Sequence, residues 1–114
     1  MHEFSLAQNI LEIVIDSARE HGLSGVAEVR LDVGQAAGVH LDALEFAWRH
    51  LKTTSDLTAD AALSINSIPA HGACANCGFS GPVTDYIRIC PACQALGLRI
   101  MGGLEFMVTG ISGE

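Results

Sequence analysis

Hydrophobic and polar positions along the first part of the chain follow a helical period. From about residue 5 to residue 21, apolar side chains return every three or four positions, which is the spacing of a helix with one buried face. Ser5 and Gln8 have the spacing of a capping box, and His21-Gly22 is a typical helix stop. The pattern therefore predicts a first helix over these residues.

A second helix and three strands follow. A helix over about residues 40 to 53 is indicated by a stripe of apolar positions on one face: Leu44, Ala47, Trp48 and Leu51. Strands are indicated by three alternating triplets: Val29, Leu31 and Val33; Ala61, Leu63 and Ile65; and Leu104, Phe106 and Val108. The fold class we expect is α/β (α+β), with a small three-stranded sheet and two helices.

All four cysteines lie between the second and third predicted strands. A chain of 114 residues, 49% of them hydrophobic, can bury one ordinary core and hold a small metal-bound module beside it. We therefore expect residues 1–69 together with residues 98–114 to form an α/β domain. Residues 70–97 would form an inserted, zinc-ribbon-like module.

The cysteines form two Cys-x-x-Cys pairs with twelve residues between the pairs: Cys74, Cys77, Cys90 and Cys93. Two thiolates three residues apart converge on one ion, so the two pairs predict a closed tetrahedral site that holds structural zinc. Iron is the open alternative, because the Cys-Pro-x-Cys turn also occurs in rubredoxin-type sites. Disulfides are the weaker alternative, because this spacing is poorly suited to bridging.

Three neighbours of the cysteines bear on the geometry of the site. Gly78 can take the positive φ that lets backbone amides turn toward sulfur, whereas Gln94 stands where a second such glycine is expected. His71 lies three residues before Cys74 and could exchange into the zinc shell, although four thiolates already saturate the ion.

Charge and motifs exclude several classes of protein. Thirteen acidic and six scattered basic side chains give a net charge of −7, so we expect no nucleic-acid partner. The chain shows no signal peptide and no apolar run of transmembrane length, which predicts no membrane partner and a reducing, cytoplasmic setting. It also shows no nucleophile elbow, phosphate loop or nucleotide fingerprint, so we expect no enzymatic activity.

The start of the chain, Met1-His2-Glu3, offers a second set of metal ligands. The His2 imidazole and its own deprotonated amide can chelate an ion, and the α-amine closes a second ring. Adding the Glu3 amide or another imidazole completes a planar set of four nitrogens, which Ni(II) or Cu(II) prefers over Zn(II). From the residues alone, a solvated His2 is the more usual interpretation. A Glu3 carboxylate that simply complements the helix dipole stays open beside a role in metal binding.

The chain as a whole resembles the HypA/HybF nickel metallochaperones. The resemblance rests on the opening Met1-His2-Glu3, on both Cys-x-x-Cys pairs, and on further positions along the chain: Ser5-Leu6, Gly34, Leu44-Glu45-Phe46, Pro69 and Gly103-Leu104-Glu105-Phe106. Two positions depart from the family pattern: Gln94, and the tail Ile111-Ser112-Gly113. Neither departure falls on an expected ligand.

The resemblance implies a function. Proteins of that family deliver nickel during maturation of [NiFe]-hydrogenase, and in some organisms of urease. The resemblance also implies that His2 and mainly the backbone of Glu3 bind nickel. It implies that structural zinc is bound by four cysteines: Cys74, Cys77, Cys90 and Cys93. It also implies a P-loop GTPase partner, the hydrogenase large-subunit precursor or urease accessory proteins as further partners, and a monomer or homodimer. The alternative is a zinc-ribbon protein-interaction module without nickel transfer.

Overall fold

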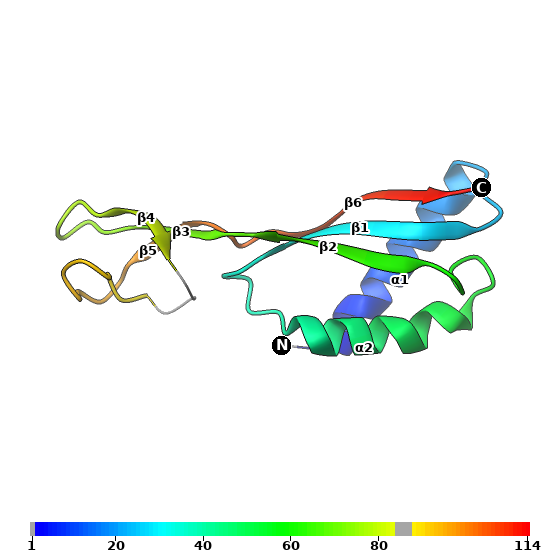
Figure 1. The fold of residues 1–114 in the computed structure, drawn as a ribbon, viewed down its shortest axis with the longest axis horizontal. Helices are drawn as coiled ribbons and strands as arrows, with labels where there is room; N and C mark the ends of the chain where they lie inside the picture. Colours follow the sequence, from blue (N-terminus) through cyan, green and yellow to red (C-terminus); the bar gives the residue numbers. More distant parts are fainter. Residues whose placement is uncertain (1, 84–87) are drawn as a thin grey trace. The chain divides into compact units, whose positions relative to one another are not determined.

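The computed structural model describes residues 2–83 and 88–114 of the chain (Figure 1). In chain order the elements are α1 (Glu3–Glu20), β1 (Val26–Gly34), α2 (Leu41–Leu51), a short 3-10 helix (Lys52–Thr54), β2 (Ala62–Ile68), β3 (Ala70–Ala73), β4 (Ser80–Val83), β5 (Arg99–Gly102) and β6 (Phe106–Gly113). Two three-stranded sheets result, with strand orders β2-β1-β6 and β4-β3-β5. None of the helices in the described residues is long and apolar enough to span a membrane.

The expected fold class is confirmed: two helices accompany a three-stranded sheet, and a second small sheet belongs to the cysteine region. Two details were wrong. Helix α1 begins at Glu3, and its N-cap is His2, which makes no side-chain capping bond, so Ser5 lies inside the helix and is not its cap. Leu104 lies before β6 and is 53% exposed, because Gly103 just before it takes a positive φ of 91° and turns the chain.

One compact unit contains both helices; it comprises residues 1–31, 39–66 and 107–114. Its core is made by the predicted apolar stripes, including Ala7, Ile10, Val14, Leu44 and Ala47. Trp48 is only 2% exposed, and its indole Nε1 donates to the Ala61 carbonyl at 3.0 Å. The tryptophan therefore closes the core against the start of β2, as buried indoles that find an acceptor do.

The second compact unit comprises residues 32–38 and 67–106. Its sheet, which the sequence pattern did not predict, has β3 at the centre. β3 pairs antiparallel with β4, from Ala70 opposite Val83 to Ala73 opposite Ser80, and antiparallel with β5 on its other side. These two units describe how the residues pack. The expected domains, residues 1–69 with 98–114 and residues 70–97, stay a prediction.

A close backbone approach explains two glycines of this second unit. Any Cβ on Gly34 would collide with the Gly103 carbonyl. The Gly34 amide donates to the Glu105 carbonyl at 2.6 Å, and the Ala36 amide donates to the Gly103 carbonyl at 2.7 Å. The Glu105 carboxylate accepts from the Gly103 amide at 2.8 Å. Only glycine permits two backbone segments to pass this closely.

Candidate metal centre

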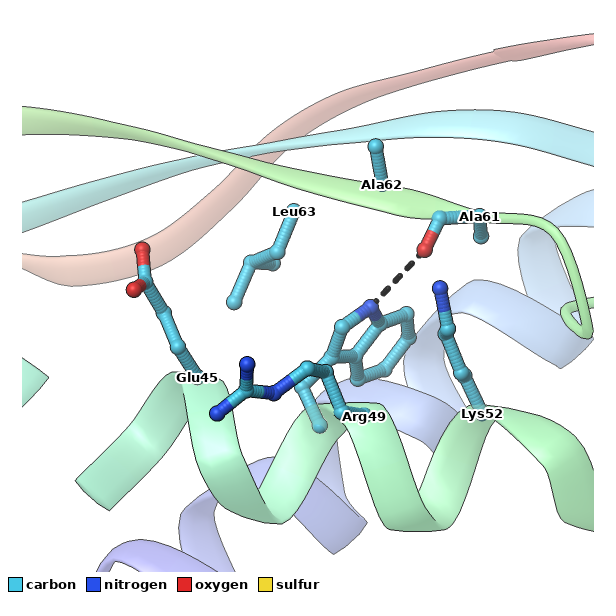
Figure 2. A pocket seen from close by; sticks show the side chains of 7 residues that line it. Glu45, Arg49, Lys52, Ala61, Ala62 and Leu63 are labelled. Atoms are coloured by element: carbon cyan, nitrogen blue, oxygen red, sulfur yellow. Dashed lines mark hydrogen bonds between the residues drawn. The ribbon is translucent and has the colours of Figure 1, made fainter. Parts of the chain in front are cut away.

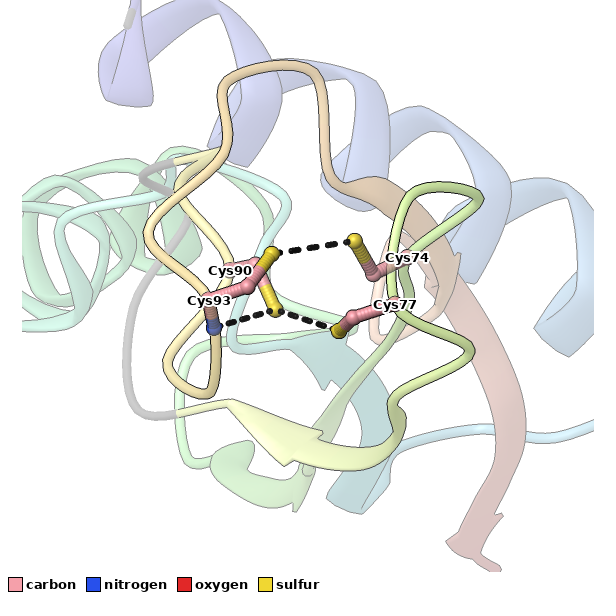
Figure 3. A group of neighbouring side chains, drawn as sticks. All are labelled: Cys74, Cys77, Cys90 and Cys93. Carbon is pink, nitrogen blue, oxygen red and sulfur yellow. Dashed lines mark hydrogen bonds between the residues drawn. The ribbon is translucent and has the colours of Figure 1, made fainter.

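The four cysteine sulfurs converge on one point. All four Sγ atoms lie within 4.8 Å of one another, and Figure 3 shows the two pairs facing each other. The Cys74–Cys93 and Cys77–Cys90 sulfurs are 3.7 and 3.6 Å apart. Tetrahedral zinc with bonds of about 2.3 Å requires sulfur separations of about 3.8 Å, whereas a disulfide requires about 2.05 Å. The donor set therefore fits zinc and not two disulfides.

The two cysteine turns have matching backbone geometry. In the first, the Gly78 amide donates to the Cys74 carbonyl (3.0 Å) and the Cys74 amide to the Phe79 carbonyl (2.8 Å). In the second, the Gln94 amide donates to the Cys90 carbonyl (2.8 Å) and the Cys90 amide to the Ala95 carbonyl (3.0 Å). Each turn thus points both of its thiols to one side, and the turns meet as two halves of one tetrahedron.

Gln94 occupies the position in the second turn that Gly78 occupies in the first. Gly78 has a φ of 80°, and Gln94 has a φ of 63°, which makes it the one non-glycine residue with a positive φ in the described part of the chain. The side chain at this position is therefore held in a backbone region that costs an L-residue about 1–2 kcal/mol.

Replacing Gln94 with glycine is expected to stabilise the second turn. The gain should be about 0.5–1 kcal/mol, because relief of the strain is partly offset by the greater freedom of glycine in the unfolded chain. The thermal midpoint of the cysteine module, followed by amide NMR signals of the zinc-loaded protein, measures it. Gln94→Ala, which keeps a Cβ, should leave the midpoint unchanged; an equal gain in both variants would contradict the strain.

Hydrogen bonds to sulfur are unequal among the four cysteines. The Asn76 side-chain amide donates to Cys93 Sγ at 3.5 Å, and together with the Ala95 backbone amide it lowers the pKa of Cys93 to about 6. At Cys77 the Phe79 backbone amide favours the thiolate, but burial and the neighbouring thiols outweigh it and raise its pKa to about 12. Four close thiols cannot all ionise by themselves, so the charge of a bound cation is needed to hold them as thiolates.

Asn76 also connects the two turns, since it lies in the first and contacts the sulfur of the second. Replacing it with alanine is expected to weaken zinc binding about tenfold, the usual scale for a lost hydrogen bond to a metal ligand. Competition with a coloured zinc chelator measures this. Asn76→Asp should bind zinc more weakly still, because a carboxylate repels the thiolate; unchanged affinity in both variants would contradict the role.

His71 is not part of the cysteine cluster. It lies on β3, exposed, with its Nε2 3.2 Å from the Ser80 hydroxyl. Among the described residues, the group of side chains close enough to share a metal ion consists of the four cysteines alone. The possibility that His71 exchanges into the zinc shell stays a prediction.

The amino-terminal candidates lie together at the start of α1. His2 is exposed, and its carbonyl accepts the Leu6 amide at 3.0 Å, which starts the helix. The Glu3 carboxylate accepts the His40 backbone amide at 3.1 Å, and this contact is the largest cause that lowers the pKa of Glu3. The α-amine of Met1 lies outside the described residues. The Glu3 side chain thus joins the start of α1 to the start of α2.

The remaining histidines make local hydrogen bonds at the helix ends. His40 is the N-cap of α2, and its Nδ1 accepts the Ala43 amide at 3.2 Å. His21 and His50 each place Nδ1 against a carbonyl four residues earlier, at 2.8 and 2.9 Å. The sequence reasoning missed Asn76, whose place inside the first Cys-x-x-Cys pair was the available signal.

Comparison with known proteins agrees with this geometry. A family model described as "Hydrogenase/urease nickel incorporation, metallochaperone, hypA" matches residues 1–113. The hydrogenase maturation factors HypA of Geobacter metallireducens and Geobacter sulfurreducens are 39% and 37% identical, with all of both chains covered. The solution structure of the Ni metallochaperone HypA from Helicobacter pylori aligns with a TM-score of 0.69 over 99% of this chain and 97% of that chain. At 18% identity this last likeness supports the fold alone.

Proposed function

The chain belongs to the HypA family of nickel-incorporation metallochaperones, and on that premise we propose that it binds Ni(II) at its amino terminus and delivers it during maturation of [NiFe]-hydrogenase. Urease is a second client that the family description includes. The chain acts as a carrier of the metal and not as an enzyme.

The observation that carries this proposal is the position of His2. It is exposed and precedes the first helical residue, so its own amide takes no part in the helical hydrogen bonds. Imidazole and amide nitrogen can therefore close a chelate ring without unwinding α1. The planar nitrogen set that results suits Ni(II).

Glu3 contributes to nickel through its backbone nitrogen. Its carboxylate is held by the His40 amide, which keeps the first turn of α1 beside the first turn of α2. The side chain thereby limits the motion of the chelating segment. Because His2 is exposed, an acceptor can still replace the nickel ligands one at a time without unfolding the donor.

The zinc supplies structure. Four thiolates close the coordination shell, so no open position is left for nickel or for a substrate. In this proposal Cys74, Cys77, Cys90 and Cys93 hold resident Zn(II), while Ni(II) is the cargo.

The proposed partners are those that the resemblance to the family implies. We place a P-loop GTPase and the hydrogenase large-subunit precursor as partners, with urease accessory proteins where urease is the client. The setting is the cytoplasm, where thiols stay reduced and able to take up zinc. The net charge of −7 favours partners with a basic surface, and their association should slow as salt rises.

A transfer experiment tests the proposal. Untagged, zinc-loaded chain carrying one nickel is mixed with hydrogenase precursor, and nickel in the precursor is measured after separation. Faster transfer than from free nickel at equal concentration supports delivery. Nickel that stays on the chain, or precursor binding without any nickel on the chain, would favour the alternative of a zinc-ribbon interaction module.

A further inference from the structure

Strand β2 lies at an edge of its sheet. In the described part of the chain the strand order is β2-β1-β6, so β2 has a neighbour on one side. Its sequence, Ala-Leu-Ser-Ile-Asn-Ser-Ile, contains no charged residue and no proline. Natural edge strands are usually protected by such residues, and an unprotected edge is a template for another strand.

A pocket of about 210 Å³ lies beside the start of this edge. Figure 2 shows the Lys52 side chain extending from α2 toward Ala61 and Ala62, and the Arg49 side chain running along α2 on the side of Glu45. Trp48, whose indole donates to the Ala61 carbonyl, also lines the pocket. The other lining residues are Glu45, Ala61, Ala62 and Leu63. The pocket therefore combines an apolar floor with a charged rim.

The two cations of this rim outnumber its one carboxylate, that of Glu45. Neither Arg49 nor Lys52 forms an ion pair in the described part of the chain; Arg49 instead lies over the Phe46 ring at 6.0 Å. The chain has only six basic residues and a net charge of −7. A pocket rim with two cations and one carboxylate, on a chain that is negative overall, is a place where an anionic group is favoured.

From these observations we propose that the edge of β2 and the Arg49/Lys52 pocket together bind an extended acidic segment of a partner protein. The segment adds as a fourth strand beside β2, so that main-chain hydrogen bonds give affinity. One of its carboxylates lies between the guanidinium and the ammonium group, where charge-assisted hydrogen bonds fix the register. An adjacent apolar side chain fills the pocket over Trp48.

A second copy of the chain fits this surface less well. Pairing β2 with β2 about a two-fold axis would bring Arg49 and Lys52 of both copies to the same interface. Glu45 of each copy offsets one of these cations, and β2 offers no further Asp or Glu, so a net positive charge would remain on both sides of the interface. Charge complementarity thus favours an acidic partner over self-association.

Nickel binding is not required for this docking, so the two proposals can fail separately. The test uses a synthetic octapeptide that alternates Val and Glu, titrated into the ¹⁵N-labelled, zinc-loaded full chain. We expect saturable shifts at β2 amides and at the indole N–H of Trp48, the single tryptophan of the chain. Amide exchange along β2 should slow as the added strand protects it.

Variants separate the site from general charge. Arg49→Glu with Lys52→Glu should weaken peptide binding about tenfold or more, since it reverses the charges that hold the carboxylate. Arg19→Glu with Arg88→Glu changes the net charge equally at two exposed positions and should bind the peptide almost as well as the parent. A matched Val/Lys peptide should not shift β2.

Three outcomes would overturn the proposal. One is that millimolar acidic peptide causes no chemical-shift change at the β2 amides. The dispersed spectrum of the parent chain then shows that the protein is folded. Another is equal binding by the Arg49/Lys52 double variant. The third is a set of β2 shifts that depends on protein concentration without peptide, which would assign the edge to a dimer.

Discussion

Replacing His2 with alanine is expected to abolish nickel binding at the amino terminus while zinc content and helix content stay unchanged. The imidazole is the one side-chain nitrogen of the proposed chelate, and backbone nitrogens alone do not hold Ni(II) near neutral pH. His2 is exposed and makes no side-chain capping bond, so its loss leaves α1 and its core intact. Isothermal titration with nickel, metal analysis for zinc and far-UV circular dichroism measure the three quantities.

Two controls define the ligand set. Glu3→Ala removes the carboxylate that binds the His40 amide but keeps the backbone nitrogen, so nickel affinity should fall far less than in His2→Ala. An extra residue placed before Met1 should weaken binding if the α-amine is a ligand. Nickel affinity that survives in His2→Ala would contradict the proposed site, and a Glu3→Ala effect equal to that of His2→Ala would make the carboxylate a ligand.

The elements whose burial is periodic could be predicted from the sequence. Val29, Leu31 and Val33 are buried on alternate positions of β1, and Leu44, Ala47 and Trp48 on one face of α2, because each element buries one of its faces. The four cysteines were equally predictable, since their spacing fixes their geometry without help from distant residues.

The parts that could not be predicted depend on contacts between distant residues. β3, β4 and β5 are four residues each, too short for a period to be recognised, and they form a sheet because the cysteine turns bring them together. The start of α1 was misplaced because His2 is its N-cap without a side-chain hydrogen bond, so no capping residue marks it. The Glu3 contact with His40 joins residues 37 positions apart.

The two proposed metal sites differ in the chemistry of their donors, and this difference keeps the metals apart. Thiolates in a tetrahedral cage suit zinc, whereas a planar set of imidazole and amide nitrogens suits nickel and gives no tetrahedral geometry. The four cysteine sulfurs would close around a zinc ion, while the proposed nickel chelate would use the exposed His2. Resident and delivered metals are thus distinguished by geometry and access.

Replacing Cys74 with serine is expected to abolish zinc binding and to disorder residues 70–97. The buried cluster of this region consists of three residues: Cys74, Cys90 and Leu98. The partly buried Phe79 and Val83 pack against this cluster. So small a cluster cannot hold the segment by itself, whereas structural zinc contributes about 10–16 kcal/mol in zinc-finger peptides. Removal of the metal therefore removes most of the module's stabilisation.

The helical part of the chain should survive the same substitution, because its core is built from α1, α2 and the sheet they cover, with Trp48 sealed against Ala61. Zinc analysis, amide NMR of residues 70–97 and the fluorescence of Trp48 report the two regions separately. Ala75→Ser, an exposed change between the same two ligands, should alter none of them. Full zinc content with an ordered module in Cys74→Ser would show that the cysteine is no ligand. If the fluorescence signal of Trp48 is lost together with the module, the helical part does not fold independently of the module.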